Sequence, residues 1–491
     1  MRIHWSPSKH MPNTLFAILT LSVTVSFGAE LASSDTRRHK HLFLDSHDIQ
    51  SMENLELVLH TPRRHPDNPI LVGSRPWEKW TAYVNGRPVL YDSASGEFKM
   101  WYLSSLMEPS AFAGIQYKAC YAVSRDGVHW HRPNLGQVHW PGSPNNNILQ
   151  WGENWMRRVN VIMNPNESDA QSRYLMTYVD VFDGITAITK GHSSDGIRWK
   201  LNADGKPWFR KHHNANLMGW DPSIRNYVMY VRMPGPSQNI IGRSISKNFI
   251  EWSEPEVVLA PKPSEPRKHF KGLAAFQYEG LYVGWLWVFQ RGAKEWLRAD
   301  AELATSRDGI HWRRPFPGQY FLSRGAPDSW DDQLAIPVAP VIRDRKIMIY
   351  YWGENMPYGR ANLERMQRGW IQDGRRIQRA TGLATLRVDG FVSVHAGAEK
   401  SGTVVIRALE PVAGNLMINA EARGDIRVTV HRLDGETIEG FNLRDSGAIQ
   451  GDSLRHRVVW RNSSKFTELV GRPVQLRFHL QDADLYSFWF E

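Results

Sequence analysis

The heptapeptide Ser124-Arg-Asp-Gly-Val-His-Trp130 decides the fold, because related copies recur along the chain. The copies are Ser193-Ser-Asp-Gly-Ile-Arg-Trp199, Ser306-Arg-Asp-Gly-Ile-His-Trp312, the degenerate Ser246-Lys-Asn-Phe-Ile-Glu-Trp252 and the truncated Ala384-Thr-Leu-Arg-Val-Asp-Gly-Phe391. In chain order, the serines of the first four are 69, 53 and 60 residues apart. Such a period is typical of repeat proteins in which each copy marks one supersecondary unit.

The repeated turn has a clear physical basis. Asp-Gly is a tight-turn pair in which glycine takes the positive φ that other residues resist. The Ser and Asp side chains can bond the backbone of the turn, and the Trp can fill the space between neighbouring sheets. A β-like run precedes each turn, at residues 98–103, 174–179, 227–231, 281–286 and 347–351. Five such units of short antiparallel strands predict an all-β fold, a five-bladed β-propeller over residues 29–390.

The repeat stops at about Phe391, and residues 391–491 have a different rhythm. The runs Val404-Val-Ile-Arg-Ala408, Ile426-Arg-Val-Thr-Val430 and Val474-Gln-Leu-Arg-Phe-His-Leu480 alternate or stay apolar between Gly and Asp turns. Short strands separated by such turns predict a C-terminal β-sandwich over residues 391–491.

Residues 1–28 have the pattern of a signal peptide. Arg2 and Lys9 give a positive start, residues 15–25 carry no charge, and Ser26 and Gly28 are the small residues expected before a cut. The uncharged run is too short to span a bilayer, and no later run is long enough. We therefore expect an exported protein, periplasmic or secreted, without a membrane span.

Composition narrows the range of partners. The chain has 491 residues with 60 Lys and Arg against 50 Asp and Glu, a formal net charge of +10. The basic residues are scattered and match no nucleic-acid motif, so we expect no nucleic acid and an acidic carbohydrate as the anionic partner. Cys120 is the single cysteine, which excludes an internal disulfide and a thiolate metal cluster. The oligomeric state stays open.

Several short motifs accompany the turns. They are Leu42-Phe-Leu-Asp45, Pro76-Trp-Glu78, Phe98-Lys-Met-Trp-Tyr102, Asn145-Asn-Asn-Ile148, Trp220-Asp-Pro222 and Leu485-Tyr-Ser-Phe488. Together with the turns, they resemble the exported bacterial proteins known as glycosyl hydrolase family 32 N-terminal-like, over nearly the whole mature chain. That group is similar to the clan of glycoside hydrolase families 32 and 43. The resemblance implies a five-bladed propeller, a following sandwich, and catalytic acids at or just before the innermost strands.

Two carboxylates are the predicted catalytic residues. Hydrolysis of a glycosidic bond needs one carboxylic acid to protonate the leaving oxygen and one carboxylate to act as nucleophile or base. Glu78 and Asp331 each stand directly before a run that the resemblance makes an inner strand. Asp332 is equally near, but alternation along a strand points only one member of this pair inward.

Cationic, amide and aromatic residues are expected to bind the substrate around the same axis. The predicted binding residues are Arg158, His213, Asn216, His269, Trp330 and Asp332, with Trp330 as a stacking platform for a sugar. A cationic ring of Arg157, Arg158, His213, Lys268, His269 and Lys271 would suit a uronate or a sulfated sugar. The histidines lack the spacing of a known metal site, so we predict no metal ligand and no cofactor, with room left for a structural calcium.

Three functions stay open on the sequence alone. The first is an exported glycoside hydrolase acting on a poly- or oligosaccharide, in particular an acidic one. The second is a non-catalytic carbohydrate-binding propeller. The third is a polysaccharide lyase, in which a His or Tyr base acts beside an arginine that neutralises the uronate. Two facing carboxylates favour hydrolysis, a His or Tyr beside Arg favours a lyase, and a cationic, aromatic pocket alone favours binding.

Overall fold

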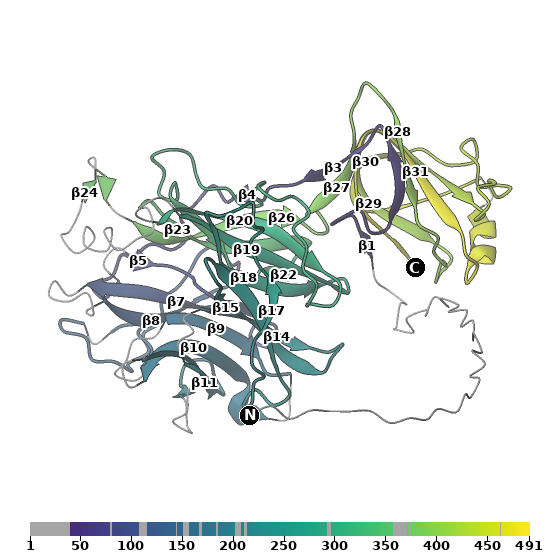
Figure 1. Ribbon diagram of the computed structural model, residues 1–491. Coiled ribbons are helices and arrows are strands. Elements are labelled where there is room, and N and C mark those ends of the chain that lie inside the picture. Colours follow the sequence, from purple (N-terminus) through teal and green to yellow (C-terminus); the bar gives the residue numbers. More distant parts are fainter. Residues whose placement is uncertain are drawn as a thin grey trace, which may run out of the picture. The chain divides into compact units, whose positions relative to one another are not determined.

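The structure is a computed structural model that describes residues 40–78, 81–107, 115–143, 145–150, 157–165, 169–182, 185–201, 208–210, 214–291, 296–356, 371–372, 375–376, 378–461 and 463–491. These residues lie nearly all in β-strands and turns, with 3-10 helices at Ala170–Ser172 and Ser463–Leu469. The chain is therefore a nearly all-β protein, as the sequence predicts (Figure 1). The predicted signal peptide over 1–28 lies outside the described residues.

Three separate antiparallel sheets follow one another along the chain. The first consists of β6 (Val89–Asp92), β7 (Glu97–Met107) and β8 (Ile115–Ser124). The second consists of β9 (Arg157–Met163), β10 (Tyr174–Phe182), β11 (Ile185–Ser193), β12 (Lys200–Leu201) and β13 (Phe209–Arg210). The third consists of β14 (Ala215–Asp221), β15 (Asn226–Pro234), β16 (Asn239–Ser246) and β17 (Glu256–Leu259).

A larger sheet contains the rest of the repeat region. One antiparallel run in it consists of β18 (Lys268–Tyr278), β19 (Leu281–Arg291) and β20 (Trp296–Ser306). A second run consists of β21 (Leu334–Pro337), β22 (Val341–Arg343), β23 (Lys346–Glu354) and β26 (Arg379–Arg387). The early strands β4 (Arg63–Arg64) and β5 (Thr81–Ala82) both pair with β26, which joins the two ends of the repeat region. A separate pair is formed by β24 (Ile371–Gln372) and β25 (Arg375–Arg376).

The repeated turns have the internal bonding that their sequence predicts. In the first turn, the backbone N–H of Gly127 donates to Ser124 Oγ at 2.9 Å. Asp126 Oδ1 accepts from the backbone N–H groups of Val128 and His129 at 2.8 and 2.9 Å. The turns at Ser193 and Ser306 repeat both contacts. The Ser and Asp side chains of these turns therefore stabilise the local backbone.

An aromatic side chain of one sheet contacts the turn of the next. The indole of Trp101 on β7 donates to the carbonyl of Gly196 at 2.7 Å, and Tyr230 on β15 donates to the carbonyl of Gly309 at 2.8 Å. Tyr350 on β23, in the last run of the repeat region, donates to the carbonyl of Gly127 in the first turn at 2.8 Å. One of these contacts therefore joins the last run of the repeat region to its first turn.

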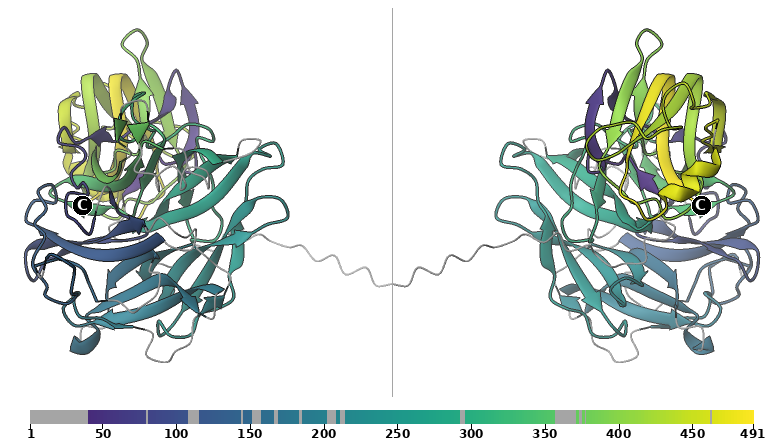
Figure 2. Two further views of the ribbon diagram at one scale, coloured as in Figure 1. Left: turned by 90° about the vertical axis from the view of Figure 1, so that its left-hand side faces the viewer. Right: turned by 90° about the vertical axis from the view of Figure 1, so that its right-hand side faces the viewer.

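The C-terminal sheet has eight strands, three of which come from the N-terminal part of the described chain. Its later strands are β27 (Val392–Ala396), β28 (Gly402–Ile406), β29 (Leu416–His431), β30 (Ile449–Arg457) and β31 (Gln475–Phe490). Its early strands are β1 (His41–Leu42), which pairs with β31, β2 (Ile49–Glu53), which pairs with β28, and β3 (Glu56–Leu59), which pairs with β27. Figure 2 shows these purple strands beside green and yellow ones. Strand pairing thus joins residues 41–59 to a sheet that the sequence places wholly after residue 390.

Candidate functional site

The first strands of successive sheets lie against one another, and we call them the inner strands: residues 81–92, β9, β14 and β18. The backbone N–H of Arg87 donates to the carbonyl of Val159 at 3.2 Å, and the side-chain amide of Asn160 donates to the carbonyl of Ala215 at 3.1 Å. Gly86 permits the first approach, because a Cβ at this position, where φ is +93°, would lie 2.6 Å from the carbonyl oxygen of Val159. Side chains at the starts of these strands can therefore meet.

Arg158 reaches the starts of two neighbouring inner strands. Its φ is +54°, in the left-handed region, and the pairing of β9 with β10 shifts register at this point. The extra residue re-aims the side chain, as bulges beside functional sites commonly do. Its Nη1 donates to Asn85 Oδ1 at 3.3 Å and to Asn214 Oδ1 at 2.8 Å.

Lys271 is the second bulged basic residue of this region. The pairing of β18 with β19 shifts register between Phe270 and Gly272, and the Lys271 side chain is buried. The side-chain amide of Asn214 donates to the carbonyl of Lys271, so one asparagine links both basic residues. Burial, together with the positive charges of Arg232, Arg158 and Arg291, lowers the pKa of Lys271 to about 7.

Asn216 lies beside the same residues with 2 % of its surface exposed. Neither its amide nitrogen nor its amide oxygen has a hydrogen-bond partner among the residues that the structure describes. A Cβ on Gly272 would lie 2.6 Å from its nitrogen, so glycine makes room for it. A buried amide without a protein partner costs free energy unless a ligand or water satisfies it. We call Asn85, Arg158, Asn214, Asn216 and Lys271 the cationic centre.

His269 adds a polar group on the same strand as Lys271. Its Nδ1 accepts from the backbone N–H of Asn239 at 3.2 Å. Burial, followed by the charges of Lys271 and Arg291, lowers its pKa to about 4. The imidazole is therefore neutral near pH 7, with its proton on Nε2. Lys268, a member of the predicted ring, instead forms ion pairs with Glu265 at 2.8 Å and Glu302 at 3.3 Å.

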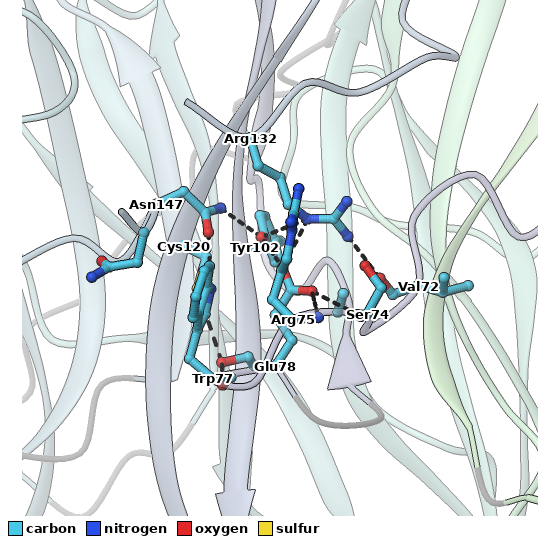
Figure 3. A network of polar contacts seen from close by, with 12 residues as sticks. Val72, Ser74, Arg75, Trp77, Glu78, Tyr102, Cys120, Arg132 and Asn147 are labelled. Carbon is cyan, nitrogen blue, oxygen red and sulfur yellow. Dashed lines mark hydrogen bonds and ion pairs between the residues drawn. The ribbon is translucent and has the colours of Figure 1, made fainter. Parts of the chain in front are cut away.

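Glu78 lies in a closed polar network on the turn before β5 (Figure 3). Its Oε1 accepts from Arg132 Nε at 2.8 Å and from the hydroxyl of Tyr102. Its Oε2 accepts from the backbone N–H groups of Ser74 and Arg75 at 3.0 and 3.1 Å. The buried carboxylate thus has four donors and holds the loop at Ser74 and Arg75 against Tyr102 and Arg132 in this structure.

Asp331 lies in a second network, with its neighbour Trp330. Its Oδ2 accepts from Arg64 Nε and from the hydroxyl of Tyr351, both at 3.0 Å, and its Oδ1 accepts from Ser329 Oγ at 2.9 Å. The ring of Trp330 stacks on Tyr351 with centroids 5.6 Å apart. Asp331 therefore connects strand β4 to the turn before β21.

The structure brings some of the predicted site residues together and separates others. Arg158, Asn216 and His269 lie on adjoining inner strands, with Arg158 joined to Asn214. No hydrogen bond or ion pair among the described residues joins Glu78 to Asp331. Asp332 Oδ2 accepts from the backbone N–H of Asp328 at 3.1 Å. His213 and the side chain of Arg157 lie outside the described residues, and the catalytic roles of Glu78 and Asp331 stay predictions.

Sequence reasoning missed Asn85, Asn214 and Arg232. The Asn85-Gly86 pair was a usable signal, because Asn-Gly is a turn pair that permits close backbone approach. It also missed Glu354, which forms a two-point ion pair with Arg379 at 2.8 and 3.0 Å. Burial raises the pKa of Glu354, and Leu334 at the start of β21 pairs with it across the sheet. A carboxyl group with this property suits a general acid.

Two kinds of feature are absent from the described residues. No group of three or more His, Cys, Asp or Glu side chains in these ranges is placed to hold a metal ion. No helix in the described part of the chain is long and apolar enough to cross a membrane.

Comparisons with known proteins give similarity of structure alone. No family model matches the chain, and no curated protein matches its sequence. A glycosyl hydrolase from Bacteroides ovatus is 14% identical, with 67% of this chain and 94% of that one covered, at a TM-score of 0.45. A β-1,2-mannobiose phosphorylase from Listeria innocua is 10% identical, with 67% and 97% covered, at a TM-score of 0.47. An N-acetylgalactosamine deacetylase from F. plautii is 14% identical, with 66% and 97% covered, at a TM-score of 0.42.

Proposed function

We propose that this chain is an exported carbohydrate-active enzyme that hydrolyses an acidic poly- or oligosaccharide at the cationic centre. The proposal includes a five-bladed β-propeller, with blades built on the inner strands and β21, and a C-terminal β-sandwich. The aromatic-to-turn contacts that return from Tyr350 to Gly127 support the closed ring. Export rests on the signal-peptide pattern of residues 1–28.

One observation carries the choice of an acidic substrate: Arg158 is held at the inner-strand starts by asparagines from two neighbouring strands. A planar guanidinium binds a carboxylate or sulfate through paired, charge-assisted hydrogen bonds. Lys271 adds a second cation and Asn216 a buried amide without a protein partner among the described residues. The sequence resemblance indicates that the substrate is a carbohydrate, and the positive charge of the cationic centre indicates that this carbohydrate is acidic.

A screen of the purified protein against neutral, uronic and sulfated oligosaccharides tests the proposal. We expect reducing ends to be released from an acidic substrate, with no ultraviolet absorbance from an unsaturated uronate. Arg158→Ala should abolish this release while the protein stays folded at the assay temperature. Equal release from neutral sugars would contradict the acidic preference. Stabilisation by acidic sugars without any release would leave binding alone.

The predicted acid pair needs a test that separates catalysis from folding. Glu78→Gln and Asp331→Asn each remove a charge that Arg132 or Arg64 now contacts. For either residue to act on substrate, it must exchange some of these bonds for the sugar. Loss of activity at an unchanged melting temperature would support the catalytic role. A loss of activity together with a lower melting temperature would identify the residue as structural. Glu354→Gln would then be the next variant.

A second candidate function, β-elimination, is favoured by Lys271. An amine with a pKa near 7 can remove a proton at neutral pH, and Arg158 could neutralise the neighbouring uronate. In that reaction the base takes the proton from the carbon beside the carboxylate, the bond between the next carbon and the glycosidic oxygen breaks, a carbon–carbon double bond forms, and the departing oxygen takes up a proton from water. Ultraviolet absorbance that accompanies release, and that disappears in Lys271→Met, would establish this reaction in place of hydrolysis.

A further inference from the structure

The turn at residues 246–252 departs from the repeat. Asn248 and Phe249 stand where the three full copies have Asp and Gly, and Phe249 has a φ of +62°. A bulky residue rarely adopts this conformation, and such strain is commonly found at functional sites. In the other turns a Cβ would lie close to an aromatic side chain of a neighbouring sheet, at 2.5 Å from the Tyr350 hydroxyl on Gly127 and 2.9 Å from Trp101 on Gly196.

The second sheet, which comes before the sheet that carries this turn, also departs from the repeat, at one position of its strand β10. The strand register places Phe98, Tyr174, Tyr227 and Tyr282 opposite the first serine of their turns. Three residues later stand Trp101, Thr177, Tyr230 and Trp285. The second sheet thus has a small threonine where the others have a large aromatic ring. These two changes lie in neighbouring sheets, on either side of the boundary between the second and the third.

A groove of about 750 Å³ lies at this boundary. The half-buried Trp220 and the largely buried Tyr227 and Phe249 form its aromatic side, with the rings of Trp220 and Tyr227 edge-to-face at 5.0 Å. Its volume is in the range of small-molecule sites. It is distinct from the cationic centre, because its lining residue Asn164 follows the end of β9 whereas Arg158 stands at the start. Six residues of strand separate the two positions by about 20 Å.

Basic residues dominate the charge of this groove. Lys200 and Lys247 are exposed in its lining, and Lys190 lies over the ring of Trp208 at 5.2 Å. Burial and the charge of Lys200 lower the pKa of His192, which also lines the groove. Asp169 is the acidic residue in the lining, and it accepts from the backbone N–H of Ser172 at 3.1 Å. The groove therefore presents net positive charge beside aromatic rings.

We propose that this groove is a second binding site, separate from the cationic centre, for a segment of an acidic saccharide chain. The lysines pair with carboxylate or sulfate groups, while the aromatic side packs against the apolar faces of sugar rings. This occupant follows from charge complementarity and from the aromatic surface. The inference does not depend on the reaction proposed for the centre.

Binding in the Arg158→Ala background isolates the groove. The probes are a galacturonic acid oligomer, a chondroitin sulfate oligosaccharide and neutral cellohexaose, measured by titration calorimetry. The test variant is Lys200→Glu with Lys247→Glu. The matched control is Lys262→Glu with Lys400→Glu, which makes the same charge change at exposed lysines outside the groove. We expect at least one acidic probe to bind and the test pair to weaken it by about tenfold, against less than about twofold for the control.

Three results would overturn the proposal. The first is an equal loss of affinity in the test and control pairs, which would indicate a general effect of charge on polyanion binding. The second is that cellohexaose binds as tightly as the acidic probes. The third is that neither acidic probe binds. Hydrogen exchange on the wild-type protein gives an independent readout if Arg158→Ala fails to fold. Acidic probes should then protect peptides that contain residues 187–201 and 245–252. Absence of protection there would also overturn the proposal.

Discussion

Arg158 has a strained backbone conformation that places its side chain between two asparagines. A non-glycine residue in the left-handed region costs about 1–2 kcal/mol. The bonds to Asn85 and Asn214 offset part of that cost and fix the guanidinium between two strands. The sequence predicted Arg158 as a binding residue from its position before a strand. It could not predict the bulge, because the register shift depends on pairing with β10.

The strain at Arg158 predicts an order of stabilities. Arg158→Gly and Arg158→Ala both remove the guanidinium, but glycine accepts a φ of +54° without cost. We therefore expect Arg158→Gly to be more stable than Arg158→Ala by about 1 kcal/mol in urea unfolding. Both variants should lose affinity for acidic saccharides to the same extent. An alanine variant as stable as the glycine variant would contradict the strain.

Lys271 predicts how binding depends on pH. Its pKa of about 7 means that it is charged below pH 7 and neutral above it. Its neighbour His269, with a pKa of about 4, stays neutral between pH 6 and 8. The affinity for an acidic oligosaccharide should therefore fall by roughly tenfold from pH 6 to pH 8, since one charge-assisted hydrogen bond is lost. Lys271→Met should bind weakly at both pH values, and an unchanged pH slope in this variant would exclude Lys271 as its cause.

At the scale of elements, the Ser-x-Asp-Gly-x-x-Trp turns were readable from sequence because their bonds are local. Ser124, Asp126 and Gly127 contact one another within four residues, so their spacing alone predicts the geometry. Glu78 shows the opposite case. Its partners Tyr102 and Arg132 lie 24 and 54 residues away in sequence, and nothing in the local pattern reports their approach. The local pattern therefore predicts a carboxylate before a strand but not the donors that hold it, and the catalytic role of Glu78 stays a prediction.

The turns predict a measurable difference between two glycines. Gly127 and Gly136 both have a positive φ, +75° and +62°, so alanine is strained by about 1–2 kcal/mol at either one. A Cβ added at Gly127 would also lie 2.5 Å from the Tyr350 hydroxyl, whereas a Cβ added at Gly136 would have no atom within 4 Å. We expect Gly127→Ala to cost a further 1–3 kcal/mol, an order-of-magnitude figure for overpacking, in thermal or urea unfolding. Equal destabilisation of the two variants would mean that the turn does not depend on its contact with β23.

At the scale of the whole molecule, the sequence predicted strand content and the change of rhythm near Phe391. It did not predict that β1, β2 and β3 pair with strands more than 300 residues later. Pairing at that separation leaves no local pattern, because short edge strands contribute only a few alternating residues. The repeat region and the C-terminal sheet are thus connected by the chain twice, once through residues 59–63 and once through residues 387–392.

Asp389 is the buried carboxylate where these parts meet. It accepts from Lys40 Nζ at 2.9 Å, Tyr278 on β18 at 2.6 Å, Asn419 on β29 at 3.0 Å and Ser487 on β31 at 2.7 Å. Burial alone would raise its pKa, but Lys40 and the hydrogen bonds from Tyr278 and Asn419 lower it below the ordinary value. A lowered pKa means that the ionised carboxylate stabilises the fold above the unfolded pKa of about 4. That contribution disappears as the pH falls through the lower, folded pKa.

Asp389→Asn should therefore destabilise the protein strongly at pH 7. Removing the charge leaves Lys40 without its partner carboxylate, and breaking a buried ion pair costs about 3–5 kcal/mol. The matched control is Asp452→Asn, which breaks an exposed ion pair with Arg387 and should cost about 0–1 kcal/mol. In urea unfolding, the gap between wild type and Asp389→Asn should begin to narrow below about pH 4, where the unfolded chain takes up a proton, and should close as the pH falls through the lower, folded pKa of Asp389. A gap that stays constant with pH would mean that shape and packing, rather than the charge of Asp389, hold the two sheets together.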